Sequence, residues 1–183
     1  LLWVNLHGGY IFGLILLIIY FLGNLAGLYA SGRSEAQEYI YKSKSIAIIF
    51  ACCLLASLCN PNGYHILVFP FALASDPFLM NNVVEFLSPN FHEPLIFKYL
   101  LLASIALFAL SRVTLNSIEL GLVILTTYMA LYSARYIPLY AIITAPILLR
   151  LIEQLKHHLS VNAMNRLARR SAGFSVIDRG SIG

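Results

Sequence analysis

Long apolar runs separated by short polar stretches dominate this chain. Runs of this length are typical of helices that cross a bilayer, because a hydrocarbon core of about 30 Å needs about 20 apolar residues. The pattern therefore predicts an all-α, polytopic membrane protein with about five transmembrane helices. We expect these spans at about residues 8–30, 45–59, 95–110, 118–133 and 137–152.

A long connection, residues 60–94, separates the second expected span from the third. We expect it to be a loop on the outer side of the membrane, from the orientation derived below. Within it, Ile66–Ala74 is apolar but too short to cross, and it contains Pro70. Such a segment is predicted to be interfacial or re-entrant. The same loop contains Pro61 and Gly63, which predict a tight turn just after the second span.

Residues 1–156 are predicted to form the transmembrane domain, and residues 157–183 a basic cytoplasmic tail. In the tail, Val161, Met164 and Leu167 recur at helical spacing beside arginines. This pattern favours an amphipathic helix on the inner leaflet, with a disordered tail as the alternative.

Composition supports a membrane protein. Hydrophobic residues make up 60% of the chain and charged residues only 11%, whereas a soluble domain carries about 25% charge. The chain starts with Leu, and a span follows without a charged segment or a cleavage site. It therefore lacks the pattern of a signal peptide, and we expect it to be a piece of a longer protein.

The distribution of Lys and Arg predicts the orientation. With five spans, ten of the twelve fall on one side, which the positive-inside rule assigns to the cytoplasm together with the C-terminus. The ten are Arg33, Lys42, Lys44, Arg112, Arg150, Lys156, Arg166, Arg169, Arg170 and Arg179. Because these cations flank apolar runs, the net charge of +4 indicates contact with membrane lipid and no nucleic-acid partner.

The opposite side collects polar residues from four separate segments. Isolated polar groups near a membrane boundary are costly, so we take these residues as candidates for a functional site, with ordinary loop residues as the alternative. They are Asn5, His7, Asn60, His65, Glu85, Asn90, His92 and Arg135.

The outer site also contains side chains of the types that bind divalent metals. The side chains of His7, His65, His92 and Glu85 are ligand types that suit zinc or manganese. No two of them share a helical face at i, i+4, so no metal site is assigned and no cofactor is evident. A divalent metal stays an open alternative.

The same four segments carry a family resemblance. WVNLHGG, LASLCNPNGYHILVFPF, EFLSPNFHEP and ARYIPLYAIITAP, in that order, resemble the C-terminal half of a group of bacterial multi-pass membrane proteins. These are similar to the GT-C glycosyltransferases, polytopic enzymes that use polyprenyl-phosphate-linked sugars. The resemblance covers roughly residues 1–150 and implies the bacterial cytoplasmic membrane, with a site at its extracytoplasmic face.

The implied reaction assigns roles to the candidates. Arg135 would hold the donor phosphate, and Asn5, Asn60, His65 and Asn90 would complete the substrate site. Glu85 would accept a proton from the acceptor hydroxyl, while His7 or His92 would donate one. The usual GT-C carboxylate lies in the first outer loop of the full protein, and this chain contains no such Asp motif.

Two other classes of function remain open. A non-enzymatic membrane subunit, packing against other membrane proteins in a larger complex, would need no catalytic carboxylate. A transporter or channel component is disfavoured because the spans carry no charge near their centres, which ion pathways normally need.

Overall fold

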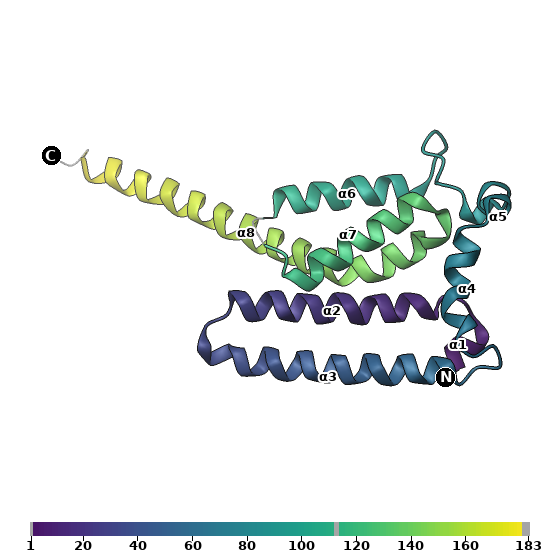
Figure 1. Ribbon diagram of the computed structural model, residues 1–183. Coiled ribbons are helices and arrows are strands. Elements are labelled where there is room, and N and C mark those ends of the chain that lie inside the picture. The colour runs from purple at the N-terminus through teal and green to yellow at the C-terminus, as the bar shows by residue number, and fades with distance from the viewer. Residues whose placement is uncertain (1, 112–113, 181–183) are drawn as a thin grey trace. The chain divides into compact units, whose positions relative to one another are not determined.

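The computed structural model describes residues 2–111 and 114–180, except for the side chains of residues 33, 159 and 161–180. Helices make up most of this part of the chain, and none of its residues forms a strand (Figure 1). The all-α prediction is therefore confirmed. The elements are α1 (Leu2–Leu6), α2 (Tyr10–Ala30), α3 (Arg33–Leu58), α4 (His65–Ala74), α5 (Pro77–Asn82), η1 (Val84–Phe86), α6 (Ile96–Leu110), α7 (Ser117–Tyr132), η2 (Ala134–Tyr136) and α8 (Ile137–Gly180).

Three stretches of helix in the described residues are long and apolar enough to cross a membrane: Tyr10–Ala30, Ser34–Leu58 and Ala134–His158. They are compatible with an integral membrane protein. The spans expected at about 95–110 and 118–133 coincide with α6 and α7, which have 15 and 16 residues. At 1.5 Å per residue these two helices are about 22–24 Å long, shorter than a typical hydrocarbon core of about 30 Å.

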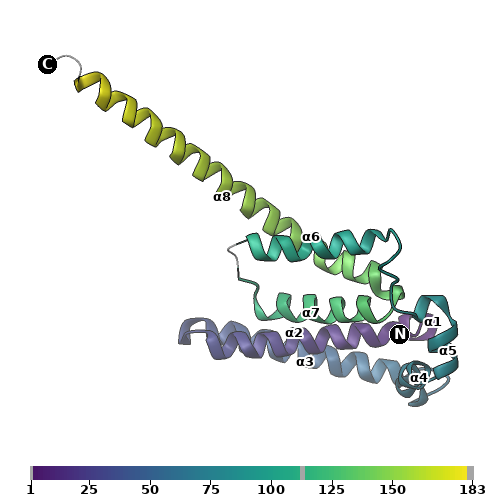
Figure 2. The ribbon, with the colours of Figure 1, turned by 90° about the horizontal axis from the view of Figure 1, so that it is seen from above.

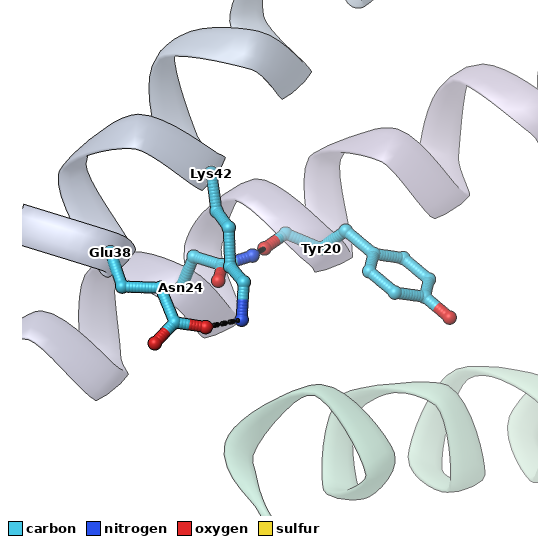
Figure 3. Close-up of polar contacts among 4 residues, drawn as sticks. All are labelled: Tyr20, Asn24, Glu38 and Lys42. Carbon is cyan, nitrogen blue, oxygen red and sulfur yellow. Dashed lines mark hydrogen bonds and ion pairs between the residues drawn. The ribbon is translucent and has the colours of Figure 1, made fainter. Parts of the chain in front are cut away.

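Helix α3 begins well before the span expected at 45–59. Its first turns are polar, but residues 34–44 contain several strong helix formers, and polarity alone does not end a helix. Glu38 and Lys42, one turn apart, form an ion pair of 2.5 Å. On the neighbouring α2, the buried side-chain amide of Asn24 donates to the carbonyl of Tyr20 at 2.7 Å (Figure 3). Local bonds thus satisfy these three side chains within the helical pair.

The chain divides into two compact units, and the first holds every candidate residue. This unit comprises Leu1–Glu93 and Leu115–Thr144, and in it α2 packs against both α3 and α7 (Figures 1 and 2). A Cβ on Gly23 of α2 would lie 3.1 Å from the Cα of Ile118 at the start of α7. Only glycine allows the two helices to approach this closely.

A hydrophobic cluster fixes the short helices at one end of α2 and α3. Val4, Tyr10 and Leu14 are buried, and side chains of α3 and α4 pack against them. The Tyr10 hydroxyl also donates to the carbonyl of Ile66 in α4 at 2.5 Å. The cluster therefore holds α1 and α4 against α2 and α3, beside the loops that carry the candidate residues.

The second unit comprises Pro94–Thr114 and Ala145–Gly183 and contains α6 and most of α8. The backbone of the predicted tail is helical to Gly180. The side chains that would form its amphipathic face, Val161, Met164 and Leu167 among them, lie outside the described residues.

Candidate functional site

Four segments that are distant in the sequence meet at one end of the first unit, which we call the loop end (residues 5–9, 60–65, 84–88 and 132–136). A cavity of about 370 Å³ opens there, lined by 18 described residues that are mainly apolar. Among its apolar walls are Phe12, Ile15, Phe69, Leu73 and Met129. The cavity is therefore a hydrophobic hollow whose polar groups are confined to a few positions.

Two candidate residues line this cavity and contact each other. Nη2 of Arg135 lies 3.0 Å from Nε2 of His7, across 128 residues of sequence. The guanidinium also lies over the ring of Phe86, 5.5 Å from its centroid, in the geometry of a cation–π interaction. Arg135 and His7, two of the candidates from distant segments, are thus brought together at the cavity.

The position of Arg135 depends on hydrogen bonds between η1 with the residues after it (85–88) and the turn that joins α7 to α8 (132–134). We call this set of hydrogen bonds the strap. The buried Ser133 hydroxyl donates to the carbonyl of Glu85 at 2.8 Å, and the amide of Ala134 donates to the carbonyl of Leu87 at 3.0 Å. The Ser88 hydroxyl donates back to the carbonyl of Tyr132 at 3.1 Å. These bonds place Phe86 beneath the guanidinium.

A second connection joins α1 to the turn after α3. The side-chain amide of Asn60 donates to Oδ1 of Asn5 at 2.6 Å. Oδ1 of Asn60 accepts from the amide of Asn62 at 2.9 Å, and Gly63 adopts a φ of +53°, which favours glycine. The tight turn predicted from Pro61 and Gly63 is confirmed. Neither Asn5 nor Asn60 lines the cavity, so their contact with each other supports the frame around it.

The remaining candidates lie outside the cavity lining. His65 stacks on Tyr64, with ring centroids 4.1 Å apart. Asn90 donates to the carboxylate of Glu93 at 2.9 Å and accepts from the amide of His92 at 3.1 Å, so these loop residues bond locally. Glu85 contributes its backbone carbonyl to the strap, as the acceptor for Ser133, and its side chain is exposed. The catalytic roles expected for Glu85 and His92 stay predictions.

The geometry bears on the open question of a metal. Within the described residues, no three His, Cys, Asp or Glu side chains are grouped as metal ligands would be. In addition, the guanidinium of Arg135 lies 3.0 Å from the Nε2 of His7, where it would repel a cation. The polar part of this cavity suits an anion better than a metal ion.

Sequence reasoning did not identify several residues that build the cavity. Ser133, Tyr132 and Tyr136 line it, yet each reads as an ordinary residue flanking Arg135. Ser133 gives no local signal, because its partner, the carbonyl of Glu85, lies 48 residues earlier. Phe86 belongs to the segment EFLSPNFHEP, and its contact with the guanidinium appears only in three dimensions.

Comparisons of the chain with models of protein families, with curated proteins and with solved structures find no match.

The strap can be tested through Ser133. Replacing Ser133 by Ala leaves the carbonyl of Glu85 without its donor and should cost about 1 kcal/mol of local stability. The amide of Ala134 should then exchange with deuterium about fivefold faster. The matched control is Ser88→Ala, whose exposed hydroxyl makes a longer bond and should change exchange less. Wild-type exchange in Ser133→Ala would contradict the strap.

Proposed function

We propose that this chain is the C-terminal membrane portion of a glycosyltransferase-like protein that binds a polyprenyl-phosphate-linked sugar at the extracytoplasmic face of a bacterial cytoplasmic membrane. In this proposal α6 and α7 also cross the bilayer, which gives five spans, and α4 is the interfacial or re-entrant segment. The family resemblance of the four loop-end segments supports it, together with the chemistry of the cavity.

The observation that carries the proposal is the cavity, where Arg135 and His7 meet apolar walls. A polyprenyl phosphate has the same two parts, because an anionic phosphate joins a hydrocarbon chain. Apolar side chains such as Phe12 and Phe69 would contact the hydrocarbon tail of the lipid. The guanidinium would bind the phosphate in the bidentate manner that arginine favours.

The location of Arg135 favours binding of an anionic lipid phosphate. The residue lies in the short turn between α7 and α8, and the strap restricts its movement. Its side chain is exposed and lies over the ring of Phe86, and in a bilayer a cation at this place would need a nearby anion or water. A lipid phosphate at the membrane surface can reach Arg135 while its hydrocarbon chain stays in the bilayer.

Sugar transfer needs a proton acceptor as well as a bound lipid. The described lining residues include no carboxylate, and the side chain of Glu85 is exposed. The proton acceptor for sugar transfer would therefore be Glu85 after a rearrangement, or a carboxylate from another part of the full protein. The same observation favours the alternative, a non-enzymatic membrane subunit that binds lipid within a larger complex. A sugar-transfer assay distinguishes the two.

Binding of a polyprenyl phosphate should depend on the shape of Arg135 as well as its charge. We expect Arg135→Lys to weaken binding about tenfold in nanodiscs of zwitterionic lipid, because the planar fork is lost while the charge stays. Arg135→Gln should weaken it further. Trp3, the only tryptophan, lies against Gly13 in α2, close to the cavity, and its fluorescence can report binding.

Lys98→Gln is the charge control, since it removes the other Lys or Arg expected on the outer side. Its affinity for the polyprenyl phosphate should match the wild type. If Arg135→Lys binds as tightly as the wild type, the cation serves only as an orientation signal and the lipid-phosphate site is wrong.

The orientation can be tested separately by cysteine labelling. The chain has three cysteines, all exposed, so Cys52, Cys53 and Cys59 are first replaced by Ala. A single cysteine placed at His65 or Asn90 should react with a membrane-impermeant maleimide in intact spheroplasts. One placed at Ser171 should react only after permeabilisation. The reverse pattern would place the loop end in the cytoplasm.

A further inference from the structure

His7 makes two contacts that its chemistry does not allow it to satisfy together. Its Nδ1 lies 2.8 Å from the amide nitrogen of Gly9, and its Nε2 lies 3.0 Å from Nη2 of Arg135. A backbone amide and a guanidinium only donate hydrogen bonds, so both require an acceptor. A neutral imidazole offers one acceptor nitrogen, and an imidazolium offers none. One contact is therefore between two donors.

The bond with Gly9 is the one expected to persist. The amide of Gly9 lies at the N-cap of α2, where backbone N–H groups lack partners within the helix. The interaction is local, across two residues, and is the shorter of the two. If Nδ1 accepts from Gly9, the neutral ring carries its proton on Nε2. That N–H then lies beside the guanidinium of Arg135, at the cavity.

We propose that His7 is a second donor to the same oxyanion that Arg135 binds, and that Gly9 positions it. An oxygen about 2.8 Å from both donors would satisfy them at once and remove the conflict between them. The N-terminus of α2 adds favourable potential for an anion. This inference rests on the proposed function, and it names the ligand class as a phosphate oxyanion, either a lipid headgroup or free phosphate.

Gly9 is suited to this role by the absence of a side chain. A Cβ at this position would lie 2.8 Å from Nδ1 and 3.2 Å from Cε1 of His7, so alanine would displace the ring. The backbone itself accepts alanine, since its φ is −67° and its ψ is −5°. At Gly32, the N-cap of α3, a Cβ would meet no atom within 4 Å, and Gly32 does not line the cavity. Gly32→Ala is therefore the control.

The first test is a binding measurement on the full chain in zwitterionic nanodiscs. Three probes are compared: a polyprenyl phosphate, inorganic phosphate and an uncharged polyprenol. We expect Gly9→Ala to weaken binding of the polyprenyl phosphate about tenfold, the loss of one charge-assisted hydrogen bond. Gly32→Ala should bind like the wild type. Weakening of inorganic phosphate by the same factor would identify free phosphate as sufficient, and an effect on the phosphate lipid alone would identify the headgroup.

Two substitutions of His7 separate donation from packing. His7→Gln keeps an N–H near the position of Nε2 and should retain most of the affinity, whereas His7→Ala should match Gly9→Ala. Nitrogen-15 NMR of labelled histidine should show the Nε2–H form with the phosphate lipid bound. The Nδ1–H form in that complex would overturn the proposal.

The failure of this inference is distinguishable from failure of the proposed function. In one outcome Arg135→Lys weakens binding while Gly9→Ala and His7→Ala do not. This result would support the lipid-phosphate site and show that His7 is not its second donor. If all three substitutions leave binding unchanged, both proposals are wrong.

Discussion

Hydrogen bonds between η1 and the turn from α7 to α8 decide where the guanidinium of Arg135 lies. Ser133 is buried and donates to a backbone carbonyl 48 residues away, while the adjacent amide of Ala134 makes a second bond to the same segment. A cation at the end of a membrane helix would otherwise extend toward water. Here the strap holds the exposed side chain of Arg135 over Phe86 and beside His7, where it lines a mainly apolar cavity.

The consequence is a cavity whose walls and polar groups differ sharply in character. Its apolar lining favours hydrocarbon, and its cation favours an anion, so an amphiphile with an anionic head satisfies both. The unusual feature is His7, which faces one donor at each ring nitrogen. A site built from two converging donors is incomplete without an acceptor, and an oxyanion supplies it.

Hydropathy predicted the helical class and the approximate positions of the apolar helices, because burial in a bilayer demands long apolar runs. The helix that contains the span expected at 45–59 starts earlier, at Arg33, and continues through the polar residues that include Glu38 and Lys42. The tight turn at Gly63 followed from local backbone preferences. Local rules of this kind act over a few residues and are visible in the sequence.

The candidate site was only partly predictable because its parts depend on long-range contacts. The side of the membrane suggested that Arg135 and His7 share a site, but nothing in the sequence specified that they touch. Glu85 was chosen for its carboxylate, whereas its backbone carbonyl is the group that the fold uses. Ser133 holds the turn that carries Arg135, and Gly9 positions the ring of His7. Their importance therefore appears only once the segments are brought together.

The central claim is that His7 and Arg135 act on one anion, and a double-mutant cycle tests it most directly. Dissociation constants for a polyprenyl phosphate are measured in the wild type, His7→Ala, Arg135→Ala and the double variant. Groups that share one ligand oxygen should show a coupling free energy of at least about 1 kcal/mol, with the double variant losing less than the sum of the single losses. Losses that add to within about 0.5 kcal/mol would contradict the claim.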